Sequence, residues 1–103
     1  MNTLKITLAC AGGMSTSLLC KKIITASEKK GFEKTECNAY PVAELKNAAP
    51  GSNVILLGPQ IAYEEKKVKA QFPDIPVIVI PMTDYGMMNG EKIFNDLADQ
   101  FGW

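Results

Sequence analysis

The sequence predicts an α/β fold: a small three-layer, doubly wound domain with a four-stranded parallel sheet and helices on both faces. Short apolar or alternating runs typical of strands alternate along the chain with segments at helical spacing, and such alternation indicates a parallel sheet. Right-handed crossovers and a first strand near the middle of the sheet give the strand order 2-1-3-4. A length of 103 residues suits one domain, residues 1–103, with a single core.

The first half of the chain supplies two strands and two helical segments. Apolar and polar residues alternate over residues 4–9, which predicts the first strand. A helix is expected over residues 15–30, because the hydroxyl residues at its start are good N-caps. Residues 34–40 alternate weakly, as an edge strand does. Pro41 then opens a short helical turn, which the sequence Pro-Gly-Ser at residues 50–52 ends.

The second half repeats the alternation. Residues 53–57 consist of one asparagine followed by an unbroken apolar run, which is typical of a strand covered on both faces. A helix is expected over residues 59–72, with proline at its first position. The fourth strand is predicted at residues 77–80, and residues 82–90 are expected to form a loop. From residue 91 onward, apolar residues recur at helical spacing and predict a last amphipathic helix.

Charge and residue usage exclude several classes of function. The 11 basic and 11 acidic residues cancel, so no basic surface favours nucleic acid or an acidic membrane. The chain has no histidine, the usual metal ligand and general base, and we expect no metal and no cofactor. No apolar run reaches the length that spans a bilayer, and the N-terminus lacks a signal pattern, so a cytoplasmic protein is expected.

The three cysteines, Cys10, Cys20 and Cys37, differ in their surroundings. Their odd number and the absence of a C-x-x-C motif argue against a disulfide framework and against a dithiol redox site. Cys20 falls on a predicted helix and Cys37 inside a predicted strand, and we interpret both as packing residues. Cys10 ends the first predicted strand, where a loop of small residues runs into a helix.

This loop is predicted to be a phosphate-binding site with Cys10 as its nucleophile. Backbone N–H groups at a helix N-terminus attract anions, and the same field favours the nucleophilic thiolate. We therefore expect Cys10 to carry a phosphoryl group transiently as a phosphocysteine. The residues predicted to bind the phosphate are Ala11, Gly12, Gly13, Met14, Ser15, Thr16 and Ser17.

Two further segments are expected to reach the same edge of the sheet. The carboxyl ends of parallel strands share one edge, where ligands bind. The segment Gly58-Pro59-Gln60 and the segment Thr83-Asp84-Tyr85 each follow a predicted strand. Three residues are therefore secondary site candidates: Gln60, Tyr63 and Tyr85. Asp84 is interpreted as a solvated turn residue.

The first helix has two faces with different expected roles. At about 100° per residue, one face gathers the residues expected to pack on the sheet: Leu19, Ile23, Ala26 and Ser27. The opposite face combines apolar and basic residues near the nucleophile. This second set is predicted to dock partner proteins, unless the last loop folds over it: Met14, Leu18, Lys21 and Lys22.

Two motifs give the chain a family resemblance. Residues 10–19, C-x-x-G-M-S-T-S-L-L, resemble the phosphate loop of enzyme IIB of the bacterial phosphoenolpyruvate-dependent sugar phosphotransferase system, lactose/cellobiose (diacetylchitobiose) class. Residues 56–63 are also similar to that family, and Tyr85-Gly86 matches more weakly. The resemblance implies a phosphocysteine at Cys10 that is loaded from a phosphohistidine on enzyme IIA. It also implies transfer to a disaccharide held by the membrane component, enzyme IIC, and a IIB component that is monomeric in isolation.

The residues of the loop bear on two alternative functions. A low-molecular-weight cysteine phosphatase has Arg six residues after its cysteine, where this chain has Thr16, so the bidentate phosphate clamp is missing. A flavodoxin-like module that binds a flavin phosphate without covalent chemistry is compatible with the fold. A cysteine at the first loop position and the few aromatic residues argue against it.

Overall fold

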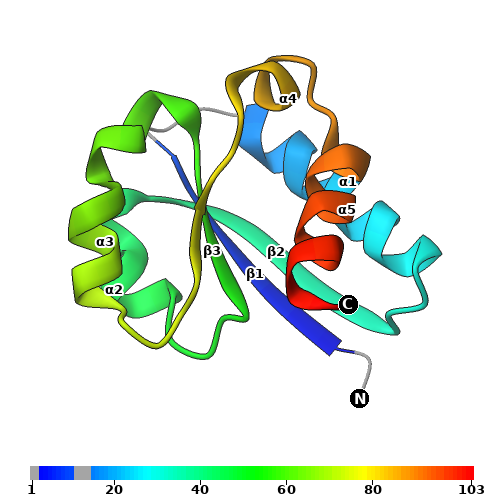
Figure 1. The fold of residues 1–103 in the computed structure, drawn as a ribbon, viewed down its shortest axis with the longest axis horizontal. Helices are drawn as coiled ribbons and strands as arrows, with labels where there is room; N and C mark the ends of the chain where they lie inside the picture. The colour runs from blue at the N-terminus through cyan, green and yellow to red at the C-terminus, as the bar shows by residue number, and fades with distance from the viewer. Residues whose placement is uncertain (1–2, 11–14) are drawn as a thin grey trace.

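The computed structural model describes residues 3–10 and 15–103 and confirms the predicted fold class. A four-stranded sheet has the order β2-β1-β3-β4, and all its neighbouring strands are parallel (Figure 1). This is the predicted order 2-1-3-4. The strands are β1 (Thr3–Cys10), β2 (Lys34–Pro41), β3 (Val54–Leu57) and β4 (Val77–Val79).

Helices cover both faces of the sheet, as expected for three layers. On one face lie α1 (Ser15–Lys29) and α5 (Gly90–Phe101), and on the other α2 (Leu45–Ala48) and α3 (Glu65–Gln71) (Figure 1). Two 3-10 helices precede α2 and α3: η1 (Val42–Glu44) and η2 (Pro59–Glu64). Within the described ranges, no helix combines the length and apolar character needed to cross a bilayer.

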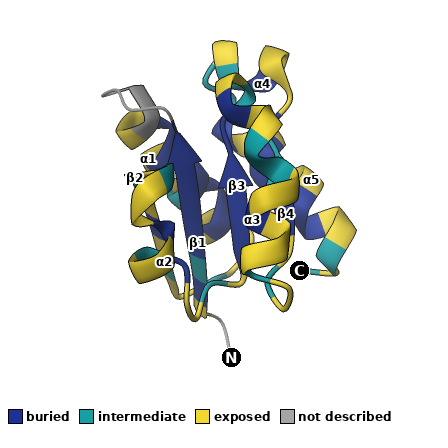
Figure 2. Cartoon of the chain, turned by 90° about the vertical axis from the view of Figure 1, so that its left-hand side faces the viewer, coloured by how far each residue is buried: buried dark blue, intermediate teal, exposed yellow. Residues whose placement is uncertain are grey.

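The sheet divides the expected single core into two apolar clusters. Side chains of a strand point alternately to opposite faces, so Leu8 of β1 packs with the cluster under α1 and α5, which contains Phe94. Its neighbour Ala9 packs with the cluster under α2 and α3, which contains Val68. The inner strands β1 and β3 are buried, whereas the helices expose their outer faces (Figure 2).

Two predicted segments differ from the structure. The single helix expected over residues 59–72 is divided into η2 and α3, because Ile61 has non-helical backbone angles (φ −118°, ψ 27°). The loop expected over residues 82–90 contains a short helix, α4 (Met82–Gly86), at the carboxyl end of the sheet. One reason is tertiary: Asp84 of α4 is buried and paired with a lysine of α5.

Gly90 allows the start of α5 to lie directly on α1. A Cβ atom added there would lie 2.6 Å from Cβ of Lys22 and 2.8 Å from the backbone nitrogen of Ile23. We expect Gly90→Ala to force the two helices apart and to lower the free energy of unfolding by about 1–3 kcal/mol. Urea denaturation measures this change.

Gly86→Ala is the matched control. It lies in the neighbouring short helix, and an added Cβ there meets no atom within 4 Å. Equal free energies of unfolding for the two variants would show that α1 and α5 can move apart to accept the added Cβ atom without loss of stability.

Candidate functional site

Cys10 is the last residue of β1, at the carboxyl edge of the sheet. Its side chain is 5% exposed, and it lies in register with Pro41 of the neighbouring strand β2. The Sγ–H group of Cys10 donates to the backbone carbonyl oxygen of Tyr40 at 3.8 Å. A carbonyl oxygen can only accept, so this contact uses the thiol proton. The proton must leave when the sulfur forms a new bond.

The helix that follows Cys10 begins where the sequence predicts. The first residue of α1 is Ser15, five positions after Cys10. The predicted phosphate-binding residues Ala11, Gly12, Gly13 and Met14 lie outside the described residues. The backbone of Ser15 and Thr16 is helical, and Ser17 is exposed on the first turn. The phosphate-binding loop therefore stays a prediction, and the strand before it and the helix after it lie where the sequence predicts.

The segment after β3 reaches the same edge as Cys10. The backbone N–H of Gly58 donates to the carbonyl oxygen of Ala9 at 3.0 Å. A Cβ atom on Gly58 would lie 3.1 Å from Oε1 of Gln60 and 3.7 Å from Cε1 of Tyr85. The absence of a side chain at Gly58 thus allows Gln60 and Tyr85 to approach the ends of the two inner strands.

Of the three secondary candidates, two share a cavity. This cavity of about 260 Å³ is lined by Leu19, Gln60, Tyr85, Gly86 and Met88. It brings together α1, η2 and α4. Tyr63 is not among its lining residues, and its side chain is 79% exposed. The structure therefore brings Gln60 and Tyr85 together and leaves Tyr63 apart from them.

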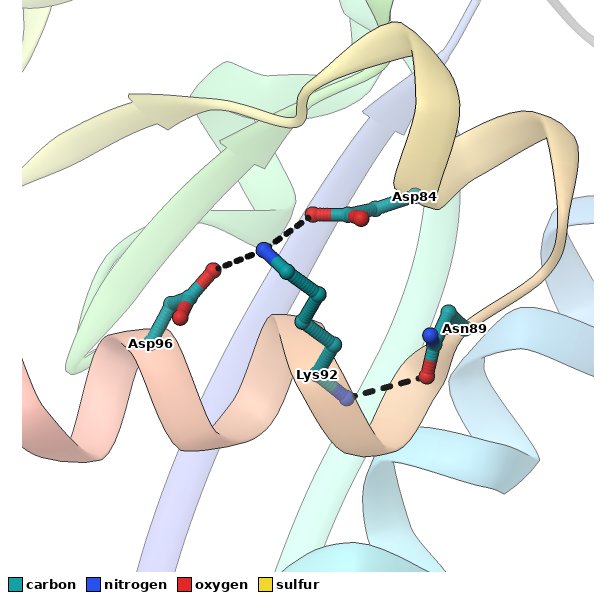
Figure 3. A network of polar contacts seen from close by, with 4 residues as sticks. All are labelled: Asp84, Asn89, Lys92 and Asp96. Atoms are coloured by element: carbon teal, nitrogen blue, oxygen red, sulfur yellow. Dashed lines mark hydrogen bonds and ion pairs between the residues drawn. The ribbon is translucent and has the colours of Figure 1, made fainter.

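Asp84 contradicts its interpretation as a solvated turn residue. It is 5% exposed, and its Oδ2 lies 3.1 Å from Nζ of Lys92 on α5 (Figure 3). Lys92 also contacts Asp96 at 2.9 Å, and hydrogen bonds to Asp96 and Asp84 raise the pKa of Lys92. A buried carboxylate needs such a partner. The pair therefore ties α4, and with it Tyr85, to α5.

Sequence reasoning missed Lys92 because only part of its network is local. Lys92 and Asp96 are four residues apart on one helix, a spacing that indicates an ion pair. Asn89 caps the same helix by accepting from the backbone N–H of Lys92 at 3.1 Å (Figure 3). The contact with Asp84 joins two helices and has no signature in the sequence.

The two faces of α1 are arranged as the spacing predicts. Leu19, Ile23, Ala26 and Ser27 are buried. On the other side, Leu18 is 49% exposed and Lys21 and Lys22 are exposed. These two lysines, with Lys29, line a groove of about 420 Å³ that α1 forms with residues 87–91.

A family model and individual relatives all match this chain to the same protein family. The family model described as "PTS system, Lactose/Cellobiose specific IIB subunit" matches residues 5–96. A galactose-specific EIIB component of the PTS system from Lactococcus lactis subsp. cremoris is 43% identical over 95 residues, covering 85% of this chain and 87% of the relative. An oligo-beta-mannoside-specific EIIB component from Bacillus subtilis is 37% identical over 92 residues, covering 87% of this chain and 88% of the relative.

Two solved structures are similar to the whole fold. The solution structure of a cellobiose-specific phosphotransferase IIB component from Borrelia burgdorferi has a TM-score of 0.70 and 34% identity, covering 90% of this chain and 86% of that one. The lactose-specific IIB domain from Streptococcus pneumoniae has a TM-score of 0.75 over 93% of this chain and 95% of that one. Its identity is 20%, so it supports the fold alone.

Proposed function

Because the chain belongs to the family of lactose/cellobiose-specific IIB subunits of the PTS system, we propose that it carries a phosphoryl group on Cys10. The group comes from a phosphohistidine on a IIA component. It goes to a disaccharide of the cellobiose, lactose or chitobiose type that a membrane IIC component holds. The observation that carries the proposal is the position of Cys10, between the end of an inner strand and the start of α1.

The chemistry consists of two transfers through one sulfur atom. In the first, the sulfur of Cys10 attacks phosphorus, a P–S bond forms, the P–N bond to the donor histidine breaks, and the thiol proton passes to the freed imidazole nitrogen. In the second, a sugar hydroxyl attacks phosphorus and loses its proton to the partner or to water, the P–S bond breaks, and the thiolate returns. The histidine and the hydroxyl belong to the partners, so this chain needs no general base of its own. Its task is positioning and electrostatic stabilisation.

In this proposal, the positive charge near Cys10 neutralises only part of the negative charge of the bound phosphoryl group. A bound phosphoryl group carries close to two negative charges, and the sequence between Lys5 and Lys21 has no charged side chain. The start of α1 supplies about half a positive charge, and backbone N–H groups and hydroxyls of residues 11–17 supply hydrogen bonds. Without an arginine clamp, the phosphoryl group stays weakly held and ready for transfer.

The partners are proposed to dock on the outer face of α1 near the nucleophile. Leu18 offers an exposed apolar side chain one turn into the helix, and Lys21 and Lys22 continue this face into the groove beside Met87. Met14, the fourth residue of the predicted surface, lies outside the described residues. The proposed setting is the cytoplasmic side of a membrane IIC component, with no nucleic acid involved.

Intact mass spectrometry tests the function directly. The chain is incubated with phosphoenolpyruvate, the general phosphotransferase proteins and a IIA component of the lactose/cellobiose type. We expect a gain of one phosphoryl unit with the acid and base lability of a thiophosphate. No gain with any IIA component of this type would contradict the proposal. A flavin absorption band in the purified protein would instead favour the flavin-binding alternative.

A further inference from the structure

Cys20 and Cys37 lie side by side although they are 17 residues apart in the sequence. Cys20 is on α1 and Cys37 on β2, and the two side chains are 4% and 5% exposed. Both line the same cavity of about 280 Å³ and belong to the same apolar cluster, and each thiol shifts the pKa of the other. Neither is in a disulfide. The proposed transfer chemistry uses neither of them.

We propose that Cys20 and Cys37 form a dithiol oxidation site, in which a peroxide converts the two thiols into a disulfide that joins α1 to β2. The proposal does not depend on the phosphoryl-carrier function. It also departs from the sequence argument against a dithiol site, which considered only a local C-x-x-C spacing. Here the two sulfur atoms come from a helix and a strand that pack on each other.

The interaction between the two thiols shifts their pKa values in opposite directions. Contact with Cys37 lowers the pKa of Cys20, against the opposing effect of burial. Contact with Cys20 and burial raise the pKa of Cys37. These directions favour Cys20 as the thiolate, which is the form that reacts with peroxides.

The reaction proceeds in two balanced steps. The Cys20 thiolate attacks one oxygen of hydrogen peroxide, the O–O bond breaks, and the departing hydroxide takes up a proton to become water. The sulfur of Cys37 then attacks the resulting sulfenic acid, the S–O bond breaks, and the proton of Cys37 leaves with the hydroxide as water. Two thiols are oxidised and one peroxide is reduced to two waters. The negative charge of the Cys20 thiolate raises the pKa of Cys37, whereas the sulfenic acid is uncharged and does not oppose loss of the Cys37 proton.

The cavity gives a small oxidant access to the buried pair. Besides the two cysteines, it is lined by the exposed residues Ser17, Lys21 and Asn38. Its volume is several times the roughly 30 Å³ that one water occupies in the liquid, so hydrogen peroxide fits.

The strand register keeps Cys37 apart from Cys10. Cys37 pairs with Ile6, whereas Cys10 pairs with Pro41. The two positions are thus offset by four residues along parallel strands, about 13 Å at a rise of about 3.3 Å per residue. Disulfides require Cα atoms within about 7 Å. The register therefore excludes a disulfide between Cys37 and the proposed nucleophile, and leaves Cys20, which lines the same cavity, as the partner of Cys37.

Non-reducing peptide mapping tests the proposal on the whole chain. The fully reduced protein is treated with hydrogen peroxide, remaining thiols are alkylated, and the protein is digested with trypsin. We expect an intact mass lower by two hydrogen atoms and a cross-link between peptide 6–21 and peptide 35–46, both reversed by dithiothreitol. Peptide 6–21 contains both Cys10 and Cys20, so a Cys10→Ala variant must show the same cross-link.

The variant Cys37→Ala completes the design. Cys20 then lacks a partner and should stop at the sulfenic acid, which dimedone traps, with no cross-link formed. Three results would overturn the proposal. One is loss of the cross-link in Cys10→Ala. Another is irreversible oxidation of Cys20 in the unaltered chain without a cross-link. The last is two unchanged thiols under conditions that fully oxidise glutathione.

Discussion

Cys10→Ser is expected to abolish uptake of the phosphoryl group from the IIA component. A serine hydroxyl stays protonated near neutral pH, and the chain has no histidine to remove its proton. Removing the nucleophile of a covalent mechanism costs at least about a thousand-fold in rate. The measurement is intact mass after incubation with the phosphorylated donor, followed over time.

The other two cysteines supply the controls for this experiment. Cys20→Ala and Cys37→Ser should keep phosphoryl uptake at the level of the unaltered chain, because both residues lie in the core cluster between α1 and the sheet. Each variant is first checked for cooperative unfolding, since both positions are buried. A phosphoryl group retained by Cys10→Ser would refute the phosphocysteine mechanism.

The double variant Leu18→Asp with Lys22→Glu should slow transfer from the IIA component. It replaces an exposed apolar side chain and reverses one charge on the proposed docking face of α1. Loss of about 2 kcal/mol of interface energy, typical of an interface hot spot, lowers transfer about 30-fold at limiting donor concentration. Alkylation of Cys10 by a small reagent should be unchanged, because the fold and the thiol are not altered.

A matched variant on the opposite side of the sheet separates docking from net charge. Ala43→Asp with Lys46→Glu makes the same charge change on exposed residues of η1 and α2. Transfer by this control should stay close to that of the unaltered chain. Equal slowing of both variants would assign the effect to net charge, and unchanged transfer in the first would place docking elsewhere.

The fold was predictable because its main signals are local. Strand runs such as residues 53–57 and the apolar periodicity of the last helix depend only on sequence neighbours, and the chirality of crossovers then limits the strand order. The short helix α4 was not predictable in this way. It has five residues, too few for a periodic pattern, and the buried pair of Asp84 with Lys92 anchors it.

The candidate site was predictable only where its signals are also local in the sequence. A strand followed by small residues and a helix start indicates where Cys10 lies, and the structure places it at the end of β1. The contact of its sulfur with the carbonyl oxygen of Tyr40 depends on the register of β1 with β2. The pairing of Cys20 with Cys37 depends on how α1 packs on β2. Both are tertiary relations between distant segments, which sequence spacing does not encode.

The ion-pair network of Asp84, Lys92 and Asp96 should constrain these three positions to different degrees in related sequences. Losing Asp96 leaves Lys92 with its buried partner, whereas losing Lys92 leaves the carboxylate of Asp84 buried without an ammonium group, which is costly. In an alignment of relatives, position 96 should therefore vary independently. Positions 84 and 92 should change together, either as a charged pair or as two uncharged residues. Frequent relatives with an acidic residue at 84 and no basic residue at 92 would contradict this coupling.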